Sequence, residues 1–266
     1  MRAGLIWIQV GSPDGGKPLN FILDSGAEAS VIGLQTARRL HLELGQPVTV
    51  RGINSTTSGY WPEYWSAAIG GVSLPANYLA MDLTALSAAC HRRVDGLIGA
   101  DFFAGRVVQI DFAKEKIRLL ENGSPRANAE VLPLQIEASR LRVPVEVAGL
   151  GKAWARLDTG CASALHWAVA ATALAGQCSS RELGVGVSSL LIRQNTQTVR
   201  LGGLTLNNIA TGLHTEKLLA GEAGLLGTGL LSQFSIVTID EPARQLVLEG
   251  LYSCKLSSPK FSSLRR

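Results

Sequence analysis

The chain has 266 residues, of which 46% are apolar, so it is long enough for about two domains with their own hydrophobic cores. No apolar stretch approaches the ~18–20 residues of a membrane span, so no membrane-spanning segment is expected in this chain. The net charge of +4 equals the charge of the last twelve residues, KLSSPKFSSLRR. The rest of the chain is neutral and has no basic stripe interleaved with aromatic residues, which argues against nucleic-acid binding.

The two ends of the chain leave its cellular compartment open. The start, MRAGLIWIQVG, is too short for a signal-peptide core and predicts a strand. The protein is expected to be cytoplasmic as written, and periplasmic or secreted if an upstream signal is missing. The basic tail, 253–266, is predicted to be solvated and mobile, with contact to a membrane or a nucleic acid as the alternative.

A hairpin pattern occurs twice, and each copy ends in an acidic turn. Residues 6–27 read IWIQVGSPDGGKPLNFILDSGA, and residues 143–161 read VPVEVAGLGKAWARLDTGC. Two apolar runs joined by a glycine-containing turn predict a β-hairpin. The segment GSPDGGKP in the first copy nearly matches a P-loop, but Pro18 replaces the hydroxyl residue and a strand follows, so it is interpreted as the hairpin turn.

A second pair of matching segments follows the two acidic turns. Residues 95–119 read DGLIGADFFAGRVVQIDFAKEKIRL, and residues 223–248 read AGLLGTGLLSQFSIVTIDEPARQLVL. Each contains an apolar pair before a glycine, a helix-like turn, and a strand that ends in Ile-Asp, at Asp111 and Asp240. These two aspartates are predicted to cap turns. Two elements in the same order at similar spacing indicate a duplicated unit.

The repeat predicts two lobes, 1–122 and 126–252, separated by the loop-rich stretch around residues 121–125. Short apolar runs between Gly, Asn and Pro indicate that strands dominate. Helix signals are short, and the best candidates are residues 35–44 and 164–175, soon after each acidic turn. The expected class is all-β, with two similar β-barrel-like lobes related by approximate two-fold symmetry, a cleft between them and few short helices.

Two aspartates, Asp24 and Asp158, face each other if the lobes pack with this symmetry. Two such close carboxylates share a proton and titrate as a coupled pair. One can then act as a general base on a water while the other donates a hydrogen bond to a carbonyl. The hydroxyls of Ser25 and Thr159 can bond across the interface. The glycines that follow each hydroxyl residue, Gly26 and Gly160, permit close approach.

FILDSGA with LIGADFF, and ARLDTGC with LLGTGLL, resemble the aspartic proteases, especially retropepsin-like proteins of bacteria, over most of the chain to about residue 250. The resemblance implies the acid-protease fold, with both lobes fused in one chain as in pepsin-like enzymes, and a dyad of Asp24 and Asp158 at the floor of the cleft. It also implies a monomer that acts on an extended peptide or protein substrate and needs no metal or organic cofactor.

The sequence departs from the pepsin-like pattern at three places, at one of which, Ala27, it agrees with the retropepsin pattern. Pepsin-like enzymes carry a hydroxyl residue after the motif glycine, whereas this chain has Ala27 and Cys161. In those enzymes a flap hairpin carries a Tyr before a Gly. The matching stretch here is VTVRGINSTTSGYW, in which Arg51 precedes Gly52. No residue of this chain is therefore assigned the role of the flap tyrosine. Tyr60 and Trp61 are candidates to close the cleft, although packing within the hairpin is the commoner role.

The remaining residues that could carry chemistry form no recognisable motif. The four cysteines show no C-x-x-C spacing and are either free or form one or two disulfides, and the four histidines lack metal-site spacing. The leading hypothesis is therefore an aspartic endopeptidase. The alternatives are a peptide-binding module on the same scaffold that has lost turnover, and a structural interaction protein with a decayed cleft.

Overall fold

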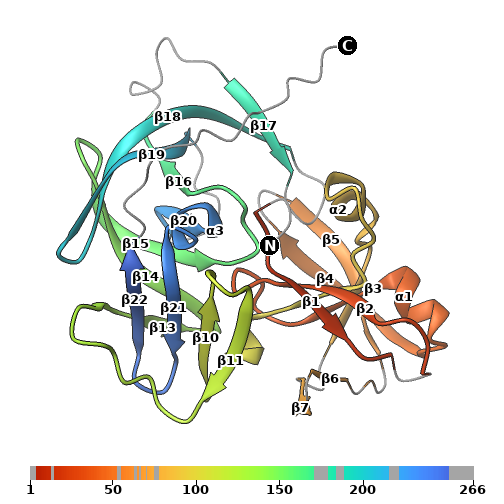
Figure 1. Ribbon diagram of the computed structural model, residues 1–266. Coiled ribbons are helices and arrows are strands. Elements are labelled where there is room, and N and C mark those ends of the chain that lie inside the picture. The colour runs from red at the N-terminus through yellow and green to blue at the C-terminus, as the bar shows by residue number, and fades with distance from the viewer. Residues whose placement is uncertain are drawn as a thin grey trace.

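The computed structural model of this chain describes residues 4–12, 15–52, 55–62, 65, 67–69, 71–74, 78–170, 179–183, 189–215 and 222–251. It is mostly β-structure with a few short helices, which confirms the predicted all-β class (Figure 1). None of the helices within the described residues is long and apolar enough to cross a membrane. The basic tail and Cys178 lie outside the described residues.

The first lobe is built on a seven-stranded sheet, shown in red to yellow on the right of Figure 1. The predicted hairpin is confirmed as its first two strands, which pair antiparallel. In spatial order the strands are β1 (Trp7–Val10), β2 (Leu19–Leu23), β9 (Gly96–Ile98), β3 (Val31–Gly33), β8 (Leu79–Met81), β5 (Ser55–Pro62) and β4 (Leu44–Gly52). A separate pair comprises β6 (Ala68–Ile69) and β7 (Val72–Ser73).

The second lobe contains an eight-stranded sheet, and the second predicted hairpin is confirmed as β14 and β15. The strands in spatial order are β13 (Gln135–Glu137), β14 (Arg140–Val147), β15 (Gly151–Asp158), β20 (Gly224–Gly227), β16 (Leu165–Ala168), β19 (Leu204–His214), β18 (Ser189–Leu201) and β17 (Ser179–Leu183). An additional pairing between β14 and β18 closes six of them into a barrel.

The two sheets repeat the same strand order and the same strand directions. β1-β2-β9-β3-β8-β5-β4 in the first lobe corresponds to β14-β15-β20-β16-β19-β18-β17 in the second. In both lobes the hairpin's second strand pairs parallel with a short glycine-containing strand, β9 or β20. The shared topology supports the two similar lobes inferred from the sequence repeat, and it extends the repeat to strands whose sequences show no visible likeness.

A five-stranded antiparallel sheet takes strands from both halves of the chain. Its spatial order is β11 (Lys116–Leu120), β10 (Val107–Asp111), β21 (Phe234–Asp240), β22 (Gln245–Leu251) and β12 (Glu130–Pro133). At its centre β10 pairs with its repeat counterpart β21 along five residue pairs. The two lobes are therefore joined by backbone hydrogen bonds as well as by the chain between them.

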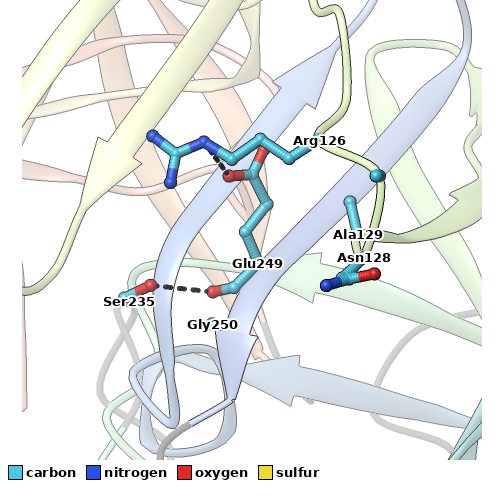
Figure 2. A pocket seen from close by; sticks show the side chains of 7 residues that line it. Arg126, Asn128, Ala129, Ser235, Glu249 and Gly250 are labelled. Atoms are coloured by element: carbon cyan, nitrogen blue, oxygen red, sulfur yellow. Dashed lines mark hydrogen bonds and ion pairs between the residues drawn. The ribbon is translucent and has the colours of Figure 1, made fainter.

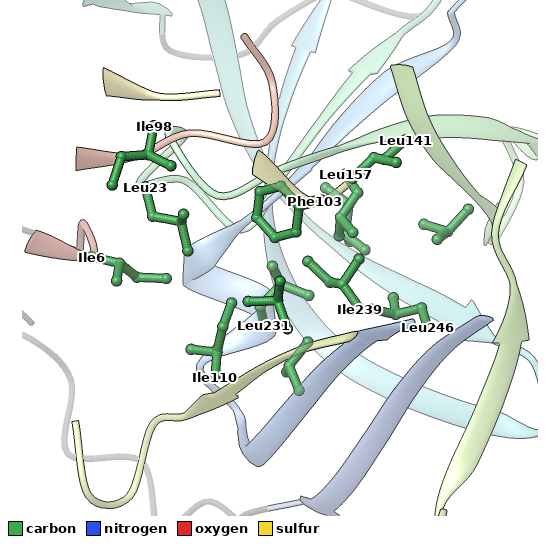
Figure 3. Close-up of a cluster of buried hydrophobic side chains, with 14 of the residues drawn as sticks. Ile6, Leu23, Ile98, Phe103, Ile110, Leu141, Leu157, Leu231, Ile239 and Leu246 are labelled. Atoms are coloured by element: carbon green, nitrogen blue, oxygen red, sulfur yellow. The ribbon is translucent and has the colours of Figure 1, made fainter. Parts of the chain in front are cut away.

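The hydrophobic core runs without interruption from one lobe to the other. Figure 3 shows Ile6, Leu23 and Ile98 of the first lobe near Leu157 and Leu231 of the second, with side chains of the five-stranded sheet beside them. All of these side chains are buried. Because apolar burial is the main stabilising contribution to folding, the shared core holds the two lobes together.

Within the described residues, four short helices begin at or soon after the ends of strands, and they correct one prediction. They are α1 (Leu34–Arg39), α2 (Thr84–Ala89), η1 (Ala100–Phe102) and α3 (Thr228–Leu231). The helix predicted at 35–44 is present but shorter. The helix predicted at 164–175 is wrong in its described part, where β16 forms because it pairs with β19 and β20. Residues 171–175 lie outside the described residues.

Candidate active site

The two signature aspartates stand at equivalent ends of equivalent strands. Asp24 follows β2, and its backbone N–H donates to the carbonyl of Ile98 at 2.8 Å. Asp158 is the last residue of β15, in register with Gly227 of β20. The parallel neighbour strand therefore fixes where each carboxyl emerges. Asp24 is 8% exposed and Asp158 is partly exposed.

The signature glycines bring these aspartates together across the interface between the lobes. A Cβ atom on Gly26 would overlap the Asp158 carboxyl, and one on Gly160 would overlap the Asp24 carboxyl. Each glycine thus leaves the space that the opposite aspartate occupies, and a larger residue there would displace that carboxyl. The two carboxyl groups are close enough to hydrogen-bond to each other.

The hydroxyl residues of the two signatures exchange hydrogen bonds reciprocally. Thr159 Oγ1 accepts from the Ser25 N–H at 2.9 Å, and Ser25 Oγ accepts from the Thr159 N–H at 3.0 Å. Each hydroxyl also donates to a strand of the opposite lobe, Ser25 to Leu157 O at 2.7 Å and Thr159 to Leu23 O at 2.9 Å. Four buried hydrogen bonds therefore fix the separation of the aspartates.

The loop around each aspartate supplies hydrogen-bond donors to its carboxylate. Asp24 Oδ1 accepts from the N–H groups of Gly26 and Ala27, both at 3.1 Å. Asp158 Oδ1 accepts from the N–H of Gly160 at 2.9 Å. Since hydrogen bonds to a carboxylate stabilise its charged form, these loops favour ionisation of both groups.

The titration of the pair reflects burial and mutual repulsion. Burial raises the pKa of Asp24, while the backbone donors at Ala27 and Gly26, the Asp158 side chain and the Arg156 charge lower it. Burial, followed by the charge of Asp24, raises the pKa of Asp158 to about 7, against lowering by Arg156, Gly160 and His166. Two carboxyls that interact this closely titrate as a coupled pair.

The candidate flap residues lie at two ends of one hairpin, formed by β4 and β5. Arg51 and Gly52 adjoin its turn and face Thr56 and Ser55 across the ladder. Tyr60 lies where β5 also pairs with β8, and it packs on the hydrophobic core. Trp61 follows it and is 45% exposed. The turn residues 53–54 lie outside the described part of the chain.

The other residues singled out in the sequence lie away from the two aspartates or have structural roles. Asp111 and Asp240 cap turns as predicted, accepting from Lys114 N and Ala243 N at 2.9 Å each. Cys90 is a free thiol. Within the described residues, no three His, Cys, Asp or Glu side chains gather as they would around a metal ion.

A surface pocket of the second lobe contains neither aspartate. Figure 2 shows it between the segment around Arg126 and strands β21 and β22. Glu249 pairs with Arg126 there, with Nε and Oε2 separated by 3.3 Å, and its backbone carbonyl accepts from Ser235 Oγ at 3.0 Å. Glu249 Oε2 is buried and makes no hydrogen bond within the described structure, so this ion pair is the polar contact shown for that atom.

Two buried charged residues beside the aspartates were not anticipated from the sequence. Arg156 and Glu222 are 4% and 2% exposed and form an ion pair. The sequence does contain a sign of this arginine, since the second signature reads ARLD where the first reads FILD. An arginine in an apolar run that leads to a signature aspartate needs a buried partner, but the sequence alone does not name that partner.

A family model described as aspartyl protease matches residues 10–102. The matched segment includes the first signature, Asp24-Ser25-Gly26, and the apolar element that ends at Gly99. No curated protein matches the chain. The match supports a similarity between this segment and the aspartic proteases. The second signature, at Asp158, lies outside the matched residues, and the repeated strand order relates it to the first.

Proposed function

We propose that the protein is an aspartic endopeptidase in which Asp24 and Asp158 together activate a water molecule. The observation that carries this proposal is the reciprocal bracing of the two signatures by Ser25 and Thr159. Four buried hydrogen bonds hold two carboxyls together although their charges repel each other. Such an arrangement costs stability, and its use for shared-proton catalysis accounts for it.

The chemistry follows from one proton distributed over two carboxyls. The ionised aspartate accepts a proton from the water, whose oxygen attacks the peptide carbonyl carbon. The protonated aspartate donates its proton to the carbonyl oxygen, which yields a tetrahedral diol. The diol then collapses: the aspartate that took the water proton gives it to the amide nitrogen, the other aspartate takes a proton from one diol hydroxyl, and the C–N bond breaks to release a carboxylic acid and an amine. Each aspartate serves once as acid and once as base, as microscopic reversibility requires.

The finer assignments belong to the same proposal. The lobes are taken as 1–122 and 126–252, with the acid-protease cleft between them and the dyad at its floor. The substrate is an extended peptide or protein segment, the enzyme works as a monomer, and the retropepsin-like, bacterial type with fused lobes is the expected subclass. The β4–β5 hairpin serves as the flap. In the second lobe, β17 and β18 stand at the corresponding place in the strand order.

The test compares the wild type with the Asp24→Asn and Asp158→Asn variants on a mixed peptide library from acid to neutral pH. Cleavage is read by mass spectrometry, and near-UV circular dichroism checks that each variant folds. Asp82→Asn is the matched control, because this aspartate only bonds to Thr84 at the start of α2. We expect the wild type and the control to cut at the same sites and both dyad variants to cut nothing.

Two outcomes would contradict the proposal. Dyad variants that cleave as well as the wild type would show that these carboxyls do no chemistry. A wild type that cleaves nothing at any pH but retains library peptides in equilibrium dialysis would identify the chain as a peptide-binding module.

A further inference from the structure

A buried arginine lies directly behind the two aspartates. Arg156 precedes Asp158 by two residues on β15, and its side chain is only 5% exposed. Its Nε and Nη2 both donate to Glu222 Oε1, at 2.9 and 2.7 Å. A guanidinium is rigid and planar, so two bonds to one partner fix its orientation. Glu222 therefore aims the remaining nitrogen of Arg156.

That remaining nitrogen reaches the opposite lobe. Arg156 Nη1 donates to the backbone carbonyl of Gly26 at 2.8 Å. The Asp158 carboxyl occupies the space in which a Cβ atom of Gly26 would lie. One side chain thus links the strand that carries Asp158 to the loop that holds Asp24, and a displacement of Arg156 would move the two carboxyls relative to each other.

This ion pair breaks the symmetry between the lobes. The registers of β2 with β9 and of β15 with β20 make Ile22 the counterpart of Arg156 and Val94 the counterpart of Glu222. Ile22 and Val94 are buried in one apolar cluster. A buried ion pair contributes no more stability than well-packed apolar residues, and often less. Since the first lobe uses apolar residues here, stability alone does not explain the charges in the second.

The charged groups around the dyad leave Arg156 as the main positive influence on it. Arg156 lowers the pKa of both aspartates, and His166 of β16 lowers that of Asp158. Glu222 partly neutralises Arg156, and Glu28 lies 3.8 Å from its Nη2. Two neighbouring arginines form ion pairs with other carboxylates, Arg140 with Glu28 at 2.6 Å and Arg142 with Glu137 at 2.9 Å.

We propose that Arg156 is a positioning residue for the two aspartates: held by Glu222, it fixes the Gly26 backbone against the second lobe and supplies the positive charge that keeps one carboxyl of the pair ionised. The inference rests on the proposed function for its catalytic meaning, but its effect on the two carboxyls can be measured without any substrate. It predicts that charge changes at residues 156 and 222 move the titration of the pair in opposite directions.

The first variant combines Arg156→Ile with Glu222→Val and so copies the apolar pair of the first lobe. We expect it to fold, with both limbs of the pH profile moved upward by about 0.5–1 unit. This shift is smaller than the roughly 1–3 units of a close unscreened charge, because Glu222 and Glu28 screen Arg156. The second variant, Glu222→Gln, leaves Arg156 less neutralised, and we expect its titration to move downward.

The control is Arg142→Met. Arg142 also approaches Glu222, with Nε and Oε1 separated by 3.5 Å, and its loss removes a largely buried positive charge beside the same carboxylate. It donates to Glu137 and makes no hydrogen bond to Gly26 in the described structure. We expect its titration to shift less than that of either test variant.

Two readouts separate this inference from the proposed function. Carbon-13 NMR of the Asp24 and Asp158 carboxyls, assigned with the two Asn variants, gives the titration directly, and peptide cleavage gives the pH profile. Opposite shifts in the two test variants support the role of Arg156. An unmoved titration in both variants overturns it, even in an active enzyme. If the double variant does not fold, Glu222→Gln decides alone: a downward shift of its titration supports the role of Arg156, and an unmoved titration overturns it.

A wild type whose carboxyls respond to Arg156 but which cleaves nothing would refute the proposed function and leave the effect of Arg156 on the pair standing.

Discussion

Replacing Thr159 by valine should weaken the contact between the lobes at its centre. The substitution keeps the shape of the side chain and removes Oγ1. The Ser25 N–H then loses its acceptor and the Leu23 carbonyl loses its donor, at a place that is buried from solvent. A buried polar group without a partner costs about 1–3 kcal/mol. With two such groups, we expect the free energy of unfolding to fall by about 3 kcal/mol.

Equilibrium urea unfolding followed by tryptophan fluorescence measures this change. Trp65 of the first lobe and Trp167 of the second are both buried, so the signal reports on both lobes. The matched control is Thr211→Val, because this buried threonine makes a single local hydrogen bond, to Ile209 O at 3.0 Å, away from the signatures. We expect the control to lose about 1 kcal/mol. An equal loss in both variants would refute the bracing argument.

Two further predictions concern the aspartates and the glycine between them. Because the pKa of Asp158 is raised from its ordinary 3.8 to about 7, its contribution to stability is full below about pH 4 and is lost as the pH rises to about 7. The midpoint of urea unfolding should therefore fall across this pH range in the wild type and fall less in Asp158→Asn. An equal fall in both proteins would contradict the assignment. Gly160→Ala should destabilise the protein by about 1–3 kcal/mol and reduce cleavage, because its methyl group overlaps the Asp24 carboxyl, whereas Gly11→Ala, with no atom within 4 Å, should change neither.

The sequence predicted most of the local structure because local signals repeat in both halves. The hairpins at residues 6–27 and 143–161 formed as their glycine-containing turns indicated. The helix expected at 164–175 failed for a tertiary reason. Counted from its aspartate, β16 occupies the place that β3 has in the first lobe, and pairing with two neighbours decided its conformation. Apolar runs of this length suit a helix or a strand equally.

Most specific contacts between residues far apart in the chain were beyond the reach of the sequence. The repeat indicated that Asp24 and Asp158 occupy equivalent positions, and the hydroxyl beside each suggested a bond across the interface. The pairing of β10 with β21 and the choice of Glu222 as partner of Arg156 join residues 66 or more positions apart. No periodicity or spacing encodes such a choice, which depends on how two sheets pack.

The five-stranded sheet has a consequence for the covalent link between the lobes. Its central strands, β10 and β21, come from opposite halves, and β12 adds to the edge of β22 just after the exposed linker at residues 121–129. A protease that cleaved this linker would therefore leave two fragments that stay associated through the backbone hydrogen bonds of the β-sheet. The peptide connection supplies proximity during assembly, whereas the sheet and the shared core supply cohesion afterwards.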